Sequence, residues 1–363
     1  MQLSIAKTII YILFSVLDII SLPLSGFKMA LLLVFGIGIL VFIIYLYSVN
    51  YYLNGGFYRR NCKHIKVKLH GKTAIITGGN AGIGKMTAID LARRGARVVI
   101  ACRNPKKAED AVKEIQGRSG SSNVVYRHLD LSDQGSVRRF AEEFLKEESR
   151  LDYLINNAGI FAAPKDQYTS EGYNMVFATN HFGHFLLTLL LLDILKKSSP
   201  SRIINVTSIA YAQAGNMHFE KRDSQGRVYP GLCEYDRSKV ANILFTKELA
   251  RRLEGTGVSA FALHPGFIKT DIFNKSTEFV GISRFALYLV LILYRSVLAI
   301  IGIDEEAGAQ TTLYCALEES LPKLSGGLFD NCRLTKEITK VVRDAGMAKK
   351  LWEVSCQATG IED

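Results

Sequence analysis

Residues 72–84 read KTAIITGGNAGIG and join a short apolar run to a glycine-rich turn. The run Lys72–Thr77 has the length and β-branched composition of a buried strand. The turn that follows it is Gly78-Gly79-Asn80-Ala81-Gly82-Ile83-Gly84. Glycines there allow a tight turn and a close backbone approach, and the N-terminus of a following helix attracts a pyrophosphate. This segment therefore predicts the first strand, turn and helix of a dinucleotide-binding fold.

A second interpretation of the same glycines is a nucleotide-triphosphate loop. Residues Gly79 to Lys85 also fit the pattern GxxxxGK. That loop needs Ser or Thr as the next residue to bind magnesium, and this chain has Met86 there. The pattern is therefore rejected as a phosphate loop.

Outward from this turn, apolar runs of strand length alternate with amphipathic stretches of helical length. The expected strands are Lys72–Thr77, Arg97–Cys102, Val124–Leu129, Tyr153–Asn156, Arg202–Thr207 and Val258–His264. The expected helices include Lys85–Arg94, Lys106–Gln116, Gly135–Glu148 and Glu234–Leu253. Such alternation predicts an α/β fold, a Rossmann-type doubly wound parallel sheet with helices on both faces. We assign this domain to residues 71–363.

The end of the second expected strand bears on the choice of cofactor. An NAD site places Asp or Glu there to bind the ribose 2′-hydroxyl, whereas an Arg accommodates a 2′-phosphate. This chain reads Ala101-Cys102-Arg103, and the first acid afterwards is Glu109. The sequence therefore predicts NADP(H), with Arg103 at the phosphate.

A candidate catalytic pair lies on the expected helix 234–253. Tyr235 and Lys239 are four residues apart, so a helix presents them on one face. A neighbouring ammonium lowers the pKa of a phenol, and such a Tyr can give a proton to a carbonyl or take one from an alcohol. Ser208 follows the strand expected at 202–207, at the sheet edge where ligands bind. A lone YxxxK is usually a solvated helix face, so the pair gains weight only in combination.

That combination resembles the short-chain dehydrogenase/reductase family over residues 70–357. The motifs occur in the order Thr77-Gly78…Gly82-x-Gly84, Asn156-Asn157-Ala158-Gly159, Asn180, Ser208, Tyr235…Lys239 and Pro265-Gly266…Thr270. The chain is similar to the membrane-anchored, NADP-preferring retinol dehydrogenases of this family in residues 101–103, 128–132, 180–188, 238–245, 264–266 and 351–356. The insertion 210–232 is also similar to that branch.

The resemblance implies a role for each matching position. Tyr235 is the acid/base, Lys239 lowers its pKa and holds the nicotinamide ribose, and Ser208 binds the substrate oxygen. Asn180 holds a water of the proton relay. The cofactor is contacted by Asp130 and Leu131 at the adenine, by Asn157, Ala158 and Gly159 in the cleft, and by Pro265, Gly266 and Thr270 at the carboxamide.

The N-terminal part of the chain has a different composition. No charged residue occurs between Met29 and Tyr58, a run long enough for a spanning helix. We expect a transmembrane helix at 29–53, a basic linker at 54–70 and, by the positive-inside rule, a catalytic domain facing the cytosol. Residues 1–28 are an apolar extension that could form a second membrane segment, be cleaved, or be skipped by initiation at Met29.

The net charge of +11 and the cysteines exclude other classes. Residues 1–70 carry +6 of that charge beside the apolar run, which favours a lipid bilayer as partner over nucleic acid. The six cysteines form no CxxC pair, which argues against zinc or a disulfide scaffold and fits a reducing compartment. His181 and His184 have helical spacing but no nearby acid, so a packed helix is favoured over a metal site.

The resemblance also implies that residues 278–303 close over the substrate, as an apolar lid. The stretch 285–294, FALYLVLILY, is too short to span a bilayer. Core packing is the alternative, because short apolar runs are ambiguous. A lid of this kind suits a lipophilic carbonyl, with retinal or retinol first, and lipid aldehydes or steroid ketones as alternatives.

A non-catalytic nucleotide-binding scaffold is the competing class, but it would not need the set Ser208, Tyr235 and Lys239. We expect an endoplasmic reticulum membrane, with a mitochondrial membrane as the alternative, and reduction of the aldehyde as the direction. Homo-oligomer formation stays open.

Overall fold

The computed structural model describes residues 65–161, 168–214, 217, 234–266, 268, 303–335 and 339–362, together with scattered helical residues between 34 and 48. Contacts divide the chain into two units, Met1–Leu53 and Asn54–Asp363. Most of the expected transmembrane segment 29–53, the whole of 1–28 and most of the lid 278–303 lie outside the described residues. Within the described part of the chain, no helix has both the length and the apolarity that crossing a bilayer requires.

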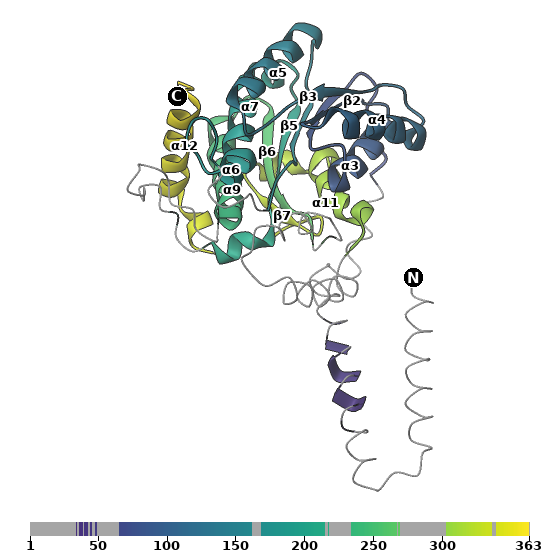
Figure 1. The fold of residues 1–363 in the computed structure, drawn as a ribbon, viewed down its shortest axis with the longest axis vertical. Helices are drawn as coiled ribbons and strands as arrows, with labels where there is room; N and C mark the ends of the chain where they lie inside the picture. The colour runs from purple at the N-terminus through teal and green to yellow at the C-terminus, as the bar shows by residue number, and fades with distance from the viewer. Residues whose placement is uncertain are drawn as a thin grey trace. The chain divides into compact units, whose positions relative to one another are not determined.

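The second unit contains a sheet whose strands run β3-β2-β1-β4-β5-β6-β7-β8 in space (Figure 1). All neighbours pair in parallel except β7 and β8, which pair antiparallel. The strands are β1 Thr73–Thr77, β2 Arg97–Cys102, β3 Val124–His128, β4 Tyr153–Asn156, β5 Ser201–Val206, β6 Val258–His264, β7 Leu328–Asp330 and β8 Arg333–Leu334. The predicted doubly wound parallel sheet is thus confirmed, with each of its six expected strands placed to within one residue.

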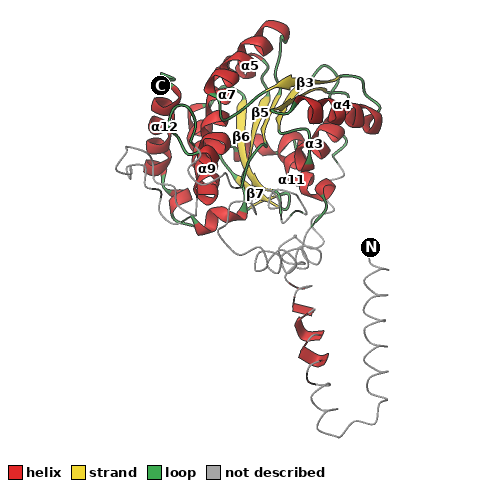
Figure 2. Cartoon of the chain, viewed as in Figure 1, coloured by secondary structure: helices red, strands yellow, loops and turns green. Residues whose placement is uncertain are grey.

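Helices cover both faces of this sheet (Figure 2). The longer ones are α3 Gly82–Arg93, α4 Pro105–Ser119, α5 Gln134–Glu147, α7 Gly183–Leu190, α9 Glu234–Arg252, α11 Glu305–Leu317 and α12 Ala345–Thr359. Shorter ones are α6 Met175–Phe177, η2 Ala178–Phe182, α8 Leu192–Lys197, η3 Ile209–Gln213, η5 Leu321–Leu324 and η6 Val341–Arg343.

Neighbouring residues of one strand point into different cores, as the two-residue repeat of a strand requires. Ile76 of β1 belongs to the cluster under α3, α4 and α11, which includes Ala88, Ala108 and Ala309. Ile75 belongs to the cluster under α5, α7 and α9, which includes Phe140, Phe185 and Phe245. The run of apolar residues in β1 therefore reflects burial on both faces.

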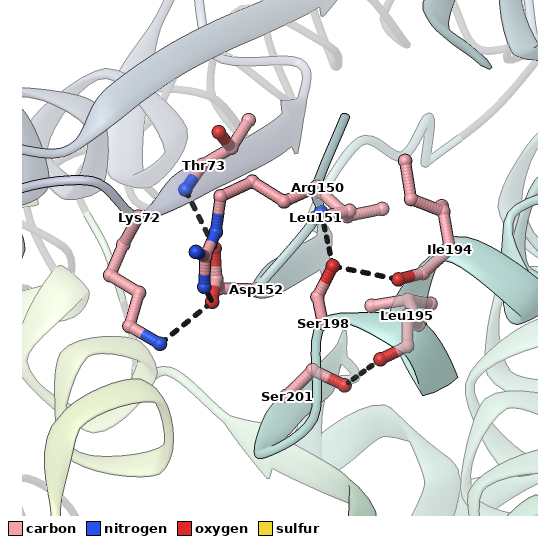
Figure 3. Close-up of polar contacts among 9 residues, drawn as sticks. All are labelled: Lys72, Thr73, Arg150, Leu151, Asp152, Ile194, Leu195, Ser198 and Ser201. Atoms are coloured by element: carbon pink, nitrogen blue, oxygen red, sulfur yellow. Dashed lines mark hydrogen bonds and ion pairs between the residues drawn. The ribbon is translucent and has the colours of Figure 1, made fainter. Parts of the chain in front are cut away.

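A buried carboxylate ties together the amino-terminal ends of β1 and β4 (Figure 3). Asp152 is 0% exposed and its oxygens accept from Lys72 Nζ at 2.9 Å, from the Thr73 amide at 2.9 Å and from Arg150 at 2.6 and 2.8 Å. These donors hold the pKa of the Asp152 carboxyl below its usual range, against the effect of burial. The candidate site lies at the opposite edge of the sheet, where the parallel strands end.

Among the cysteines, Cys102, Cys315 and Cys356 are buried and form no disulfide bond. Cys332 is disulfide-bonded. The disulfide bond of Cys332 departs from the reduced cysteines that the sequence led us to expect.

Candidate active site

The glycine-rich turn between β1 and α3 adopts a backbone that needs glycine. Gly78 and Gly82 have φ values of +66° and +57°, in the left-handed region. A Cβ at Gly84 would lie 2.6 Å from both Asn157 Nδ2 and the Gly78 carbonyl oxygen. Side chains at these positions would push the turn away from α3 and from the end of β4.

The N-terminus of α3 is open in a way that suits an anion. Its N-cap, Ala81, makes no side-chain cap, and no acidic residue occupies the first turn. By contrast, the N-cap side chains of four of the longer helices accept backbone hydrogen bonds, at Asn104, Asp133, Asp304 and Asp344. Unpaired amides at a helix start bind phosphate. The turn therefore fits the pyrophosphate of a dinucleotide, as predicted for Gly78, Gly79, Asn80, Ala81, Gly82, Ile83 and Gly84.

The predicted adenosine contacts lie at the ends of β2 and β3. The Arg103 side chain is 70% exposed, and its Nη1 lies 3.8 Å from Asp130 Oδ2. Asp130 is held in place because its Oδ1 accepts from the amide and the hydroxyl of Ser132 at 3.0 and 2.6 Å. Leu131 is buried, and a Cβ at Gly183, the first residue of α7, would lie 2.2 Å from its carbonyl oxygen. Arg103 thus reaches into solvent beside the position predicted for the adenine.

The residues after β4 bring the cofactor cleft and the catalytic residues together. Asn157 Nδ2 donates to the Thr77 carbonyl at 2.9 Å, which joins the ends of β4 and β1. A Cβ at Gly159 would lie 3.3 Å from Asn180 Oδ1 and 3.4 Å from Lys239 Nζ. Gly159 thereby keeps open a space between those two polar atoms, which is where a relay water is expected.

The three predicted catalytic side chains Ser208, Tyr235 and Lys239 are brought together. Tyr235 lies in the first turn of α9, and the Lys239 ammonium is 5.3 Å from the centroid of its ring. Ser208 begins η3 directly after β5, and its side chain hydrogen-bonds with that of Tyr235. Lys239 Nζ donates to the Val206 carbonyl at 3.2 Å, which fixes the ammonium at the end of the same strand.

The pKa of Tyr235 departs from the expectation drawn from the sequence. Burial raises the pKa of Tyr235 to about 12, and the hydrogen bond with Ser208 opposes this only in part. Burial also lowers the pKa of Lys239 to about 8. Burial is the largest influence on this phenol, so the lowering of its pKa that was expected from the Lys239 ammonium is not found.

Asn180 lies in the π-helical turn η2, a feature frequent at functional sites. Its Nδ2 donates to the carbonyl of Ile160 and to Ser238 Oγ, both at 3.0 Å, and its Oδ1 accepts from the Ile160 amide at 2.8 Å. Ser238 Oγ in turn donates to the Tyr235 carbonyl at 2.6 Å. Asn180 is therefore fixed to both the β4 loop and the catalytic helix.

The sequence did not single out Phe161, Ser238 or Asn242 for this site. The Phe161 ring lies 5.0 Å from that of Tyr235. Asn242 Nδ2 donates to the Asn180 carbonyl at 3.1 Å. Both α9 residues stand within eight positions of Tyr235, so the helical periodicity of α9 was an available signal, whereas nothing in the sequence marked Phe161.

The segment after β6 is described only in part. Pro265 and Gly266 follow β6 directly, with Gly266 at a φ of +92°, while Thr270 lies outside the described residues. A parallel bridge pairs Ile268 with Ile303. The chain on either side of the expected lid therefore leaves and returns at one place beside the site.

Comparison with known proteins agrees with this geometry. The short chain dehydrogenase family model matches residues 72–281. The chain is 44% identical to mouse retinol dehydrogenase 12, over 87% of this chain and 93% of that protein, and 43% identical to human retinol dehydrogenase 13, over 82% and 87%.

Two solved structures share the fold. An uncharacterised protein from Mycobacterium paratuberculosis is 34% identical, with a TM-score of 0.62, over 83% of this chain and 97% of that one. A protein described as an NAD(P)-dependent gluconate 5-dehydrogenase from Beutenbergia cavernae, solved with NADP at low occupancy, is 25% identical with a TM-score of 0.56, over 73% and 96%. This chain belongs to the short-chain dehydrogenase family and is an oxidoreductase related to the retinol dehydrogenases.

Proposed function

We propose that this oxidoreductase transfers a hydride between NADP(H) and a lipophilic carbonyl or alcohol, with retinal and retinol as the first candidates. The observation that carries the proposal is the meeting of Ser208, Tyr235 and Lys239 at the edge of the sheet that holds the glycine-rich turn. Relatives that are 43–45% identical and are named retinol dehydrogenases support the substrate class.

The chain's own residues do the proton chemistry. When bound, the nicotinamide supplies or accepts the hydride. Ser208 and Tyr235 bind the substrate oxygen, and the protonated Tyr235 hydroxyl donates to it as the carbonyl is reduced. Lys239 places a positive charge near the phenolate that this donation leaves. A raised phenol pKa favours the protonated acid that reduction of the aldehyde requires.

Replacing Tyr235 with Phe tests the mechanism. The variant keeps the ring against Phe161 but loses the acid, so kcat should fall by about 10²–10⁴-fold. Membranes that contain the wild-type chain or the variant would be assayed with retinal, nonanal and a keto-steroid. Undiminished turnover by the variant would contradict the mechanism. Turnover of nonanal or the steroid, with no turnover of retinal, would favour the alternative substrates.

The preference for NADP(H) is proposed from Arg103. Its exposed guanidinium at the end of β2 can pair with a 2′-phosphate, and no acid follows β2 before Glu109. Arg103→Ala should raise KM for NADPH about 10-fold and leave KM for NADH within about 2-fold. Exposed Lys106→Ala in α4 is the control. Equal or tighter binding of NADH by the wild type would refute the preference.

We further propose that the chain is held in the endoplasmic reticulum membrane with its catalytic domain in the cytosol. Support comes from the charge-free run 29–58 and from exposed large apolar side chains in the described residues of the first unit, among them Val34, Ile37 and Phe42. The disulfide bond of Cys332 is unusual for a cytosolic protein, so orientation needs its own test. Asn274-Lys275-Ser276 matches the acceptor pattern for N-glycosylation, so a glycosidase-sensitive mass shift that Asn274→Gln removes would place the domain in the lumen.

A further inference from the structure

The hydroxyl of Thr77 lies at the meeting point of β1 and β4, fully buried. Its Oγ1 accepts from the amides of Asn157 and Ala158, both at 2.9 Å. These two residues line the predicted cofactor cleft. Two further atoms lie near Oγ1, namely Nε2 of His184 at 2.9 Å and the carbonyl oxygen of Ile155 at 3.4 Å. Since the two amides occupy both lone pairs of the hydroxyl, its proton goes to the nearer of these atoms, Nε2, and the Ile155 carbonyl is the more distant acceptor.

The other ring nitrogen of His184 faces the catalytic element. Its Nδ1 lies 3.1 Å from the carbonyl oxygen of Asn180, which can only accept. Nδ1 therefore carries the ring's single proton. The hydrogen-bond network thus assigns one neutral tautomer to His184. A second proton on Nε2 would face an oxygen that has no free lone pair.

These contacts form a continuous path from the glycine-rich turn to Tyr235, the proposed acid. Thr77 is the residue directly before Gly78 of that turn. The Asn180 carbonyl is also held by Asn242, and its side chain is tied through Ser238 to the backbone of Tyr235. Among the described residues, His184 is a side chain that bonds to both the cofactor half and the catalytic half of this path.

We propose that His184 is a positioning residue that couples the cofactor turn to Asn180. Through Nε2 it fixes the Thr77 hydroxyl and, with it, the amides of Asn157 and Ala158. Through Nδ1 it fixes the π-helical carbonyl of Asn180. The inference rests on the proposed function for the nicotinamide cofactor and for the role of Asn180.

The two bonds can be separated by substitution. The amide of His184→Asn retains a donor near the position of Nδ1 but does not reach Thr77. This variant should weaken NADPH binding by about 10-fold and keep kcat within about 3-fold. His184→Phe loses both bonds and should lower kcat by about 30-fold as well. NADPH binding is measured without substrate, by nicotinamide fluorescence, and kcat with whichever carbonyl of the panel turns over.

Thr77 supplies the second half of the test. Thr77→Val should weaken NADPH binding as His184→Asn does, and the double variant should be little worse than either single one, because both remove the same link. Thr77→Ser keeps the hydroxyl and should restore binding to within about 2-fold of the wild type. This pair decides the question even if His184→Phe fails to fold.

Ser198 offers a matched control at the other end of β4 (Figure 3). Its buried hydroxyl accepts from the Leu151 amide at 2.9 Å and donates to the Ile194 carbonyl at 2.7 Å. Ser198→Ala removes a comparable buried hydroxyl far from the cofactor turn. It should lower Tm and leave NADPH binding and kcat within about 2-fold of the wild type.

The proposal is overturned if folded His184→Phe matches the wild type in both its affinity for NADPH and its kcat. It is equally overturned if Ser198→Ala shows the same kinetic losses, or if the Thr77→Val and His184→Asn effects multiply. If the wild type binds NADPH but reduces none of the carbonyls, the proposed substrate class is wrong. The role of His184 is then tested by NADPH binding alone. A wild type that binds no NADPH defeats both.

Discussion

Lys239 carries a positive charge in a position that is 3% exposed. Its ammonium donates to the Val206 carbonyl, and burial lowers its pKa from 10.5 to about 8. A depressed pKa means that the folded protein holds this proton less tightly than the unfolded chain does. The charge of Lys239, to which we assign a role in the proposed reaction, is therefore a cost to the stability of the cofactor-free protein.

Lys239→Met should consequently stabilise the cofactor-free protein while it abolishes turnover. Below pH 8 both the folded and the unfolded chains are protonated at Lys239, and the full penalty of burying the charge applies. The penalty fades as pH rises from 8 to 10.5. The gain in unfolding free energy should be roughly 1–3 kcal/mol at pH 7 and shrink toward pH 10.5.

Chemical denaturation at several pH values checks this, with exposed Lys349→Met on α12 as the control. A variant that is less stable than the wild type at pH 7 would contradict the buried-charge argument.

The residue types of the site could be predicted from the sequence, but their electrostatics could not. Tyr235 and Lys239 follow from their spacing on one helix. The direction of the Tyr235 pKa depends on how much solvent the surrounding loops remove, and those loops come from distant segments. For the same reason the contact between Thr77 and His184, which are 107 positions apart, was not foreseen.

At the scale of elements, six strands and the glycine turn could be predicted because each is a local apolar run or a local backbone requirement. β7 is three residues long, Leu328–Asp330, and too short to give a period. The π-helical turn η2 is set by tertiary contacts of Asn180, since the sequence around it is that of an ordinary apolar helix. Thr270 and most of the lid lie outside the described residues, so those predictions stand as predictions.

The buried Asp152 cluster belongs to this scale because it joins β1 to β4. Asp152→Asn would leave Lys72 and Arg150 without their counter-charge and turn an amide N–H toward donors. We expect unfolding free energy to fall by about 2–4 kcal/mol. Since the cluster lies at the amino-terminal edge and the site at the carboxyl-terminal edge, kcat should stay within about 2-fold of the wild type.

Exposed Asp193→Asn in α8 is the control for the loss of one carboxylate. An Asp152→Asn protein as stable as the wild type would show that the cluster contributes no net stability.

At the scale of the whole molecule, pH dependence is set in part by buried imidazoles, of which the described residues include His181, His184 and His264. Burial lowers the pKa of His181 to about 3 and the pKa values of His184 and His264 to about 4. The unfolded chain takes up these protons near pH 6.5, before the folded protein does. Stability is therefore complete above pH 6.5 and falls as pH drops toward 4.

Each buried imidazole should add up to about 1.4 kcal/mol per pH unit to this loss. Unfolding free energies measured by denaturant between pH 7 and 4 check the slope. His264→Gln should reduce the slope of unfolding free energy against pH by the equivalent of about one proton. A free energy of unfolding that stays constant over this interval would refute neutral burial of the three rings.

The bridge between Ile268 and Ile303 brings together the two ends of segment 269–302. Lengthening a segment whose ends are held together adds little to the entropy cost of closing it, because that cost grows only with the logarithm of the segment's length. Residues 269–302 can thus diverge among relatives, or be exchanged between them as a cassette, while the sheet, the glycine turn and the acid stay in register. Because the segment contains most of the expected substrate lid, we expect such an exchange to change the substrate range and to leave the chemistry unaltered.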